Sequence, residues 1–373
     1  MISPIPHLHM HINASKHNIK QYIVEYIREN GPISIEYFMH IISTHYYANN
    51  KAIGVDADFI TAPEISQMFG EIIAIFLINH FLNKIEQTNH KSQITLVELG
   101  GGKGTLMSDI LRCSKSYPDF YNSISNILML EKSEHMQEAQ SHNINNISDH
   151  KIPINHHTEI NNLISHITEI RKAHHSQYTF FIANEFFDAL PIRQYSYSAR
   201  DKSLYEVRVH YSNEQDLHLG ISTSHKIAIK TDQLKNGDIL EHHHTTNVIN
   251  KSISNTMRSR DCAIIIDYGY TKPPYLSSLQ AIYKHNKVSN IFEHLGDADL
   301  SSLINFQQLK QIYDAKHHTT ITTQREFLLQ NGIMQRAQKL MSVTDKPHTI
   351  ARQLNRLIDN EEMGELFKVL LVT

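Results

Sequence analysis

The sequence contains few cysteines, the residues that stabilise many secreted or metal-bound domains. It has two cysteines in 373 residues, Cys113 and Cys262, which lie far apart and outside any Cys-X-X-Cys or Cys/His spacing. This scarcity excludes a disulfide framework and a structural zinc site, and it is typical of a reducing compartment. The longest apolar run, residues 72–78, is interrupted by Asn79 and His80, well short of the roughly 18 residues of a membrane span. We therefore predict no membrane span.

Targeting signals and a strong net charge are also lacking. The N-terminus has neither the basic start nor the long apolar core of a signal peptide, and no arginine precedes Arg28. The net charge of −3 gives no global positive field, so we expect no nucleic-acid partner. The 27 histidines would make the chain strongly cationic below about pH 6.5. Some of these histidines occur as the pairs 156–157, 174–175 and 317–318 and the triplet 242–244, and we expect them to lie in polar loops. We expect them to bind no metal, because no carboxylate or cysteine stands near them at the spacing of metal ligands.

The order of apolar segments predicts a doubly wound α/β fold. Helical spacing dominates up to about residue 85, and short continuous apolar runs alternate with helices from residue 94. Four runs have the length of strands buried on both faces of a parallel sheet: 94–97, 127–130, 178–182 and 263–266. Between the last two, three alternating segments predict an inserted antiparallel meander. We divide the chain into an N-terminal helical cap with a covering loop (1–92), a core (93–192 and 262–373) and an insertion of meander plus helix (193–261).

A glycine-rich run follows the first buried strand and precedes a helix. Glu98 begins the run, and Gly100, Gly102 and Gly104 follow at every second position. Glycines allow a tight turn and close approach of a ligand, while the helix N-terminus offers free N–H groups. A dinucleotide site needs G-X-G-X-X-G, and an acid at the strand end would repel pyrophosphate. The pattern instead favours the cationic methionyl end of S-adenosyl-L-methionine, with a ligand-free glycine turn as the alternative.

Four further acidic residues follow the other three buried strands. Glu131 could accept bonds from both ribose hydroxyls, or it could be a surface residue at a strand end. Glu185 and Asp188 could hold a cationic acceptor, because carboxylates suit a guanidinium, or they could favour a helix dipole. Asp267 could line the acceptor side, or belong to a turn that Gly269 permits. These residues predict an acceptor site beside the cofactor.

Ordered motifs along nearly the whole chain resemble the MidA proteins and their mitochondrial relatives, the complex I assembly-factor arginine methyltransferases. The motifs are Gly31–Ile33, Asp58–Ser66 with Phe69–Glu71, Glu98–Leu106, Asn184–Pro191, Ile266–Tyr270, Leu279–Ala281 with His285, Gln324 with Phe327–Leu328, and Met363–Val369. The chain departs from the family pattern at three places: Ala57 precedes Asp58, Leu303 replaces a histidine, and Asn305 replaces an aspartate.

The resemblance implies a seven-stranded Rossmann-like methyltransferase sheet. Its N-terminal helices and the Phe59-to-Glu64 loop would fold over the cofactor, which places Thr61 and Asn184 among the cofactor-binding residues. The implied substrate is an arginine in the large peripheral-arm subunit of respiratory complex I. The expected location is the cytoplasm of a bacterium, or the mitochondrial matrix in a eukaryote.

We predict an enzyme that methylates a protein arginine, with Glu185, Asp188 and Asp267 as catalytic residues. The alternative is a non-catalytic scaffold that binds S-adenosyl-L-methionine and assists assembly of a respiratory complex, which the altered segment 299–306 favours. An NAD-dependent oxidoreductase ranks below both because of the glycine spacing. A homodimer is a further expectation.

Overall fold

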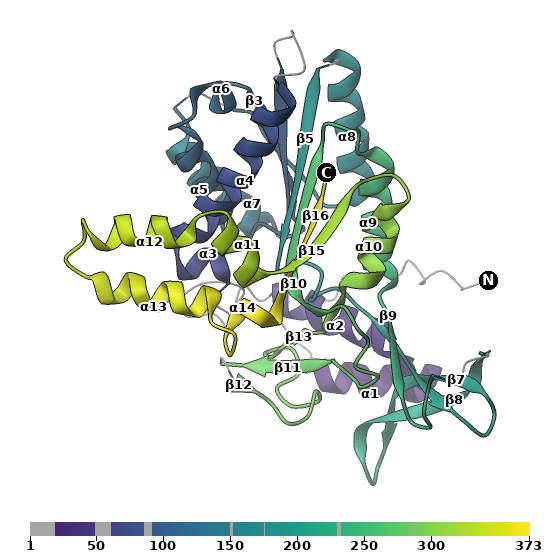
Figure 1. The fold of residues 1–373 in the computed structure, drawn as a ribbon. Coiled ribbons are helices and arrows are strands. Elements are labelled where there is room, and N and C mark those ends of the chain that lie inside the picture. The colour runs from purple at the N-terminus through teal and green to yellow at the C-terminus, as the bar shows by residue number, and fades with distance from the viewer. Residues whose placement is uncertain are drawn as a thin grey trace.

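A mostly parallel sheet forms the centre of the molecule (Figure 1). The structure, a computed structural model, describes residues 19–48, 61–85, 92–149, 152–174, 176–229, 233–284 and 286–373. The sheet order is β15-β16-β10-β5-β2-β3-β4. Its strands are β2 (Gln93–Leu99), β3 (Ile124–Leu130), β4 (Ile154–His157), β5 (Gln177–Asn184), β10 (Cys262–Tyr270), β15 (Thr319–Thr323) and β16 (Phe367–Val372). The short strand β14 (Ile304–Asn305) pairs with β10, so the sheet has eight strands rather than the seven predicted.

One strand of this sheet, β16, runs against the others, and the strand order reverses at β2. β16 runs antiparallel to both β10 and β15, and the other pairs on the path are parallel. The chain leaves β2 for β3 and β4, then returns to the opposite side of β2 as β5. This is a topological switch point, and ligands of open α/β sheets bind at the carboxyl ends of the strands there.

Helices cover both faces of the sheet. One face packs against α4 (Gln67–Ile85), α5 (Thr105–Ser114), α6 (Pro118–Tyr121) and α7 (Glu134–Ile147), and the other against α8 (Ile160–Ala173), α9 (His244–Thr256) and α10 (Phe306–Asp314). Successive strand residues alternate between the two cores: Leu96 joins the first and Val97 the second. Both faces are therefore buried, which explains the continuous apolar runs that predicted these strands.

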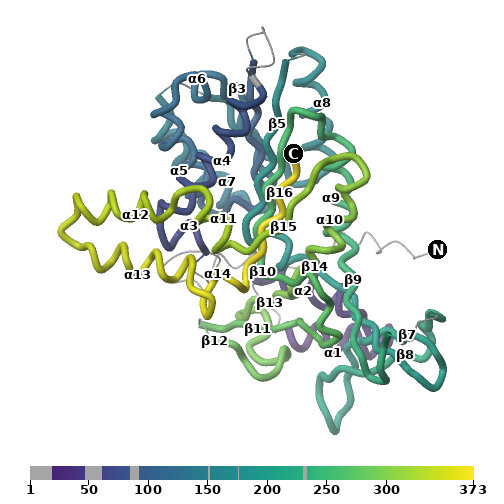
Figure 2. The backbone as a smooth tube through the Cα atoms, viewed as in Figure 1, coloured from purple at the N-terminus to yellow at the C-terminus, as the bar shows by residue number. Residues whose placement is uncertain are grey.

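Four helices follow β15 beside the first face: α11 (Gln324–Gln330), α12 (Ile333–Met341), α13 (Pro347–Ile358) and α14 (Met363–Leu366). The chain then returns as β16, next to the edge of the sheet, where the yellow end of the tube in Figure 2 lies between β10 and β15. β15 and β16 thereby form one side of the sheet.

A second group of elements packs below the carboxyl ends of the strands as Figure 1 is drawn. It contains α1 (Ile19–Asn30), β1 (Ile33–Ser34), α2 (Ile35–Ala48), β6 (Arg193–Ser198), β7 (Ser203–Ser212), β8 (Asp216–Ala228), β9 (Ile239–His242), β11 (Gln280–Tyr283), β12 (Asn286–Lys287) and β13 (Asp299–Ser301). The meander is present as predicted, and β1 pairs with its β7. One core joins α1, α2, β7 and residues 279–300. The N-terminal segment, the insertion and part of the predicted core region therefore pack as one unit.

Two predictions about the histidines are wrong. His156 and His157 lie in β4 and His242 ends β9, rather than in loops. Within the described ranges, no group of three or more His, Cys, Asp or Glu side chains could hold a metal ion. No helix in those ranges combines the length and apolar content that crossing a bilayer demands.

Candidate active site

The glycine loop connects β2 to α5 and packs against the chain that follows β5. Gly100 has a φ of +67°, and a Cβ there would lie 2.5 Å from Cδ2 of Phe186. A side chain would therefore meet both backbone strain and the aromatic ring. Because β2 and β5 are paired in parallel register, their carboxyl ends lie side by side. The structure thus brings the glycine motif and the Asn184–Pro191 motif into direct contact.

Buried polar groups beneath the loop fit a cationic ligand. Glu98 is 3% exposed, and its Oε2 has no hydrogen-bond partner within the described residues. Burial, with a smaller contribution from the nearby carboxylate of Glu131, raises the pKa of Glu98 to about 8. A Cβ on Gly101 would lie 2.9 Å from Cδ of Glu98 and 2.6 Å from Cε of Met129. An orphaned carboxyl beneath a side-chain-free loop can accept the ammonium group of a methionyl moiety, so these residues fit S-adenosyl-L-methionine.

Glu131 stands just past the end of β3, on the same side of the loop. Its Oε1 accepts a bond of 2.9 Å from the Ser133 backbone N–H, and burial raises its pKa. Gln140 of α7 donates its side-chain N–H to the carbonyl of Gly102 at 2.9 Å. Gln140 therefore fixes the loop from behind, a role that the sequence analysis missed. The predicted ribose contact of Glu131 agrees with this placement and stays a prediction.

Glu185 has the most constrained backbone of the predicted acceptor residues. Its φ is +51°, which is uncommon outside glycine and clusters at functional sites. Its Oε1 accepts bonds from the Ala62 backbone N–H at 2.8 Å and from Asn184 Nδ2 at 3.1 Å. Burial raises the pKa of Glu185 to about 7, against the lowering effect of the Ala62 bond. The residue is partly exposed, and a carboxyl with this pKa can both bind a cation and exchange a proton near neutral pH.

Asp188 and Asp267 have different surroundings although both follow buried strands. Asp267 is fully buried and accepts bonds from the backbone N–H groups of Phe187, Asp188 and Tyr268. Asp188 is partly exposed, and its carbonyl accepts a bond from the Ser302 N–H at 2.9 Å. Burial raises the pKa of both carboxyls. These bonds make Asp267 a positioning residue for the turn that carries Glu185 and Asp188, and its direct contact with an acceptor stays a prediction.

A four-residue helix, α3 (Ala62–Ile65), joins the two halves of the site. Its Glu64 accepts a 2.6 Å bond from the hydroxyl of Thr105, the first residue of α5, while its Ala62 donates to Glu185. Thr61 precedes the helix as its cap residue. Residues 59 and 60 of the predicted covering loop lie outside the described residues, as do the Ala57 departure and His285. The described part of the loop contacts both the glycine helix and the acceptor motif.

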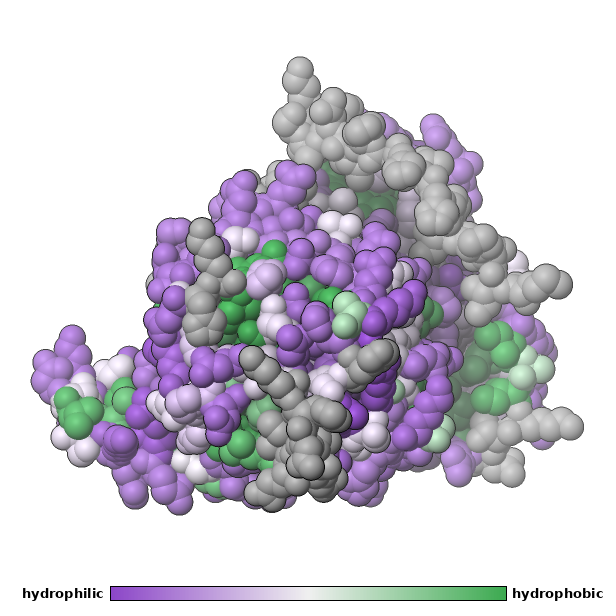
Figure 3. All heavy atoms as spheres, turned by 90° about the horizontal axis from the view of Figure 1, so that it is seen from above, coloured by the Kyte–Doolittle hydropathy of each residue, from purple (hydrophilic) through white to green (hydrophobic). Residues whose placement is uncertain are grey.

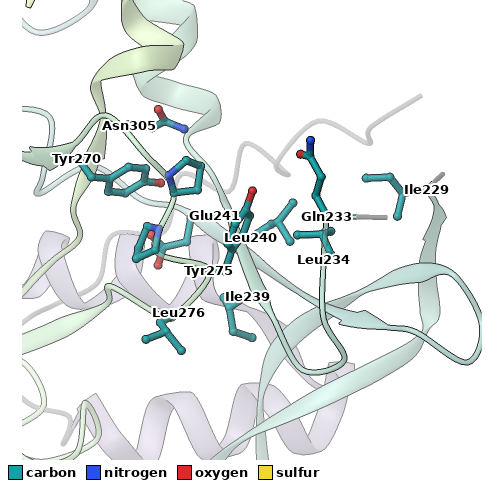
Figure 4. A pocket seen from close by; sticks show the side chains of 12 residues that line it. Ile229, Gln233, Leu234, Ile239, Leu240, Glu241, Tyr270, Tyr275, Leu276 and Asn305 are labelled. Atoms are coloured by element: carbon teal, nitrogen blue, oxygen red, sulfur yellow. The ribbon is translucent and has the colours of Figure 1, made fainter. Parts of the chain in front are cut away.

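The two other departures from the family pattern lie beside β10. The Leu303 N–H donates to the Ser278 hydroxyl at 2.9 Å, and Asn305 caps α10 by accepting from the Gln308 N–H at 3.0 Å. Figure 4 shows Asn305 and Tyr270 at one end of a pocket between the insertion and β10. Its other labelled side chains are Ile229, Gln233, Leu234, Ile239, Leu240, Glu241, Tyr275 and Leu276. Asn305 therefore combines a structural role with a place in this pocket.

The comparisons with known proteins agree with this geometry. Residues 76–323 match the family described as "Putative S-adenosyl-L-methionine-dependent methyltransferase". The chain is 29% identical to the mitochondrial protein arginine methyltransferase NDUFAF7 of Danio rerio, over 94% of this chain and 86% of that protein. It is also 29% identical to the mitochondrial NDUFAF7 homolog of Caenorhabditis elegans, over 93% of this chain and 83% of that protein.

A solved structure from Burkholderia thailandensis, bound to S-adenosyl-homocysteine, has the same fold. The TM-score is 0.72 at 18% sequence identity, and the match covers 95% of this chain and 91% of that one. The family match covers well over half of the chain, and the glycine loop with its orphaned glutamate lies inside it. The chain belongs to the S-adenosyl-L-methionine-dependent methyltransferases.

Proposed function

We propose that this chain transfers a methyl group from S-adenosyl-L-methionine to a guanidinium nitrogen of an arginine in a protein. The observation that carries the proposal is the pair of acidic residues Glu185 and Asp188, both partly exposed, in the turn that packs against the glycine loop. Carboxylates suit a guanidinium in both charge and geometry. The relatives named protein arginine methyltransferases, which align over more than nine tenths of the chain, support the same acceptor.

The cofactor, when bound, supplies a methyl group already activated on a cationic sulfur. The residues proposed to hold it are Glu98, Gly100, Gly102 and Gly104 at the methionyl part, Glu131 at the ribose, and Thr61 with Asn184 around them. Glu185 and Asp188 would orient the guanidinium in line with the methyl group, which is the main requirement of such a transfer. Glu185 would accept the proton that methylation releases, because its pKa is raised by burial to about 7.

The test is transfer of radiolabelled methyl groups to the purified large peripheral-arm subunit of respiratory complex I, followed by amino-acid analysis for methylarginine. Labelled methylarginine is the expected product, and Gly102→Val should abolish it because that glycine has a φ of +52° within the loop. Labelling that survives this substitution, or label on another residue type, contradicts the proposal.

A non-catalytic scaffold is the second candidate, and one observation favours it. Leu303 stands where the family has a histidine, so a group able to exchange protons is missing at that place. A scaffold would bind S-adenosylhomocysteine and the subunit without producing methylarginine. The same assay separates the two candidates when it is paired with a binding measurement.

Three finer proposals depend on the resemblance. They are the complex I subunit as substrate, a homodimer, and the cellular location. The two relatives above are named as mitochondrial proteins, which supports the mitochondrial matrix for a eukaryotic source, whereas a bacterial source implies the cytoplasm. Analytical ultracentrifugation of the purified chain decides between monomer and homodimer.

A further inference from the structure

The helical hairpin of α12 and α13, residues 333–358, projects from the body of the molecule at the left of Figures 1 and 3. We call this hairpin the basic arm. It contains five lysines and arginines, Arg336, Lys339, Lys346, Arg352 and Arg356, and a single acid, Asp345. The whole chain has a net charge of −3. The arm is therefore a local positive surface on a molecule that is otherwise slightly acidic.

The arm is fixed in place rather than loosely attached. Ile333, Ala337, Leu354 and Leu357 bury its apolar side in the main core. Arg336 binds Glu71 of α4 through two bonds, from Nε at 2.6 Å and from Nη2 at 2.7 Å. Such a paired contact holds a guanidinium in one orientation. The cationic side of the arm is consequently presented at a defined position.

Two cations of the arm, Arg352 and Arg356, form a row with His348 that leads to the active site. His348, Arg352 and Arg356 recur every four residues of α13 and are all exposed, so they lie on one side of the helix. No ion pair within the described residues involves Lys339, Lys346, Arg352 or Arg356. Like charges at this spacing repel each other, and α13 contains no acid that offsets the repulsion.

The inner end of the row reaches the proposed acceptor site. α13 packs against α3, whose Ala62 donates to Glu185. Arg356 is close enough to lower the pKa of Glu185, which burial raises to about 7. The charges of the site thus follow an order: carboxyl groups at the centre, then a row of exposed cations leading outward along the arm.

We propose that the basic arm binds an acidic segment of the protein substrate next to the methylated arginine. The inference rests on the proposed function, which makes a protein the substrate. The positive charge of the arm is complementary to an acidic segment of that protein. From His348 to Arg356 the row is about 12 Å long at the helix rise of ~1.5 Å per residue. An extended chain covers that length with about four residues. The substrate would therefore have several acidic residues within a short distance of its acceptor arginine.

The test measures binding of fluorescein-labelled hexaglutamate to the full chain by fluorescence anisotropy, with hexaglutamine as the neutral probe. The variant is Lys346→Glu combined with Arg352→Glu, which leaves Arg356 and the acceptor carboxyls untouched. The matched control is Lys172→Glu combined with Lys235→Glu, two exposed residues on α8 and in the insertion that carry the same change in net charge. Affinity for S-adenosylhomocysteine should stay the same in both variants, which shows that each one folds.

We expect hexaglutamate to bind more tightly than hexaglutamine, and the arm variant to lose roughly tenfold in affinity while the control stays within about twofold. Equal losses in the two variants, or no preference for hexaglutamate, overturn the proposal. Tighter binding of a dodecathymidine oligonucleotide or of phosphatidylserine vesicles, lost in the same arm variant, also overturns it in favour of a different partner. Peptide binding requires no methyl transfer, so absent methylarginine with an intact hexaglutamate preference would contradict the proposed function alone.

Discussion

The two halves of the active site are built in different ways. On the cofactor side, Glu98, the glycines and Glu131 lie within one β-α-β stretch, and local backbone geometry forms the site. On the acceptor side, Glu185 depends on a bond from Ala62, 123 positions earlier in the chain, and its turn depends on Asp267. A local motif specifies a cofactor site, whereas tertiary packing specifies the acceptor site.

The two halves also differ in the hydrogen bonds that their acidic side chains accept. Among the residues that the structure describes, none donates a hydrogen bond to Oε2 of Glu98, as expected of a carboxyl that binds a ligand. Asp267 accepts three backbone bonds, as a residue that supports the structure would. The acidic residues at the strand ends therefore have different roles. Four measurements test this difference between the two halves.

The largest effect is expected on the cofactor side, from Gly100→Ala. The added Cβ would lie 2.5 Å from the Phe186 ring at a φ of +67°. We expect the affinity for S-adenosylhomocysteine to fall roughly 100-fold, since strain and clash together cost about 3 kcal/mol. Calorimetry measures the loss. Gly237→Ala is the control, because its φ is +90° and nothing lies within 4 Å; a similar loss there would disprove a local cause.

A substitution on the acceptor side should lower the rate of methyl transfer and leave the affinity for the cofactor product nearly unchanged. Glu185→Gln removes the proposed proton acceptor while the amide keeps nearly the same shape. We expect methyl transfer to slow about 100-fold and the affinity for S-adenosylhomocysteine to change less than about threefold. Glu169→Gln on the exposed side of α8 is the control. Equal losses of rate and cofactor affinity would mean that the two halves are not separable.

The raised pKa of Glu98 should make the stability of the ligand-free protein depend on pH. Burial raises its pKa to about 8, so the folded chain binds a proton there more tightly than the unfolded chain. Stability from this group is full below about pH 4.5 and is lost as the pH rises toward 8. Glu98→Gln should therefore raise the melting temperature at pH 8 by about 3 °C, and by less at pH 5.5. Thermal unfolding with the exposed Glu134→Gln as control measures this difference; a pH-independent gain contradicts it.

The smallest effect is expected from Asn305→Asp, which restores the residue typical of the family. Aspartate caps a helix about as well as asparagine, so the bond to the Gln308 N–H is kept. We expect the methyl-transfer rate and the melting temperature to change little, by less than about twofold in rate. A tenfold gain in rate would show that Asn305 suppresses catalysis, and it would favour the scaffold.

The same contrast explains what the sequence alone could predict. β2, β3, β5 and β10 lie between two helical layers, so their apolar runs are continuous and easily recognised. The edge strand β4 contains His156 and His157 within only four residues, and such a short polar edge strand has no periodicity to detect. The glycine loop was predicted because the strand, the glycines and the helix that define it are adjacent in the chain.

The parts that the sequence did not reveal depend on long-range contacts. No local pattern connects Ala62 with Glu185, or Gln140 with Gly102, since these bonds exist only once the sheet has formed. Residues 280–301 were assigned to the core, yet they form a small sheet of β11, β12 and β13 that packs with α1 and α2. Its strands are too short to show a recognisable alternation of apolar and polar residues.

The position of β16 has a consequence for the order in which this chain can fold. β16 lies between β10 and β15, so β15 has no partner in the sheet until residues 367–372 are available. A chain still being synthesised would expose the edge of β10 during this time, and unpaired edges promote association with other chains. Completion of the sheet therefore requires β16 to insert between β10 and β15, and until then the facing edges of both strands stay open to other chains.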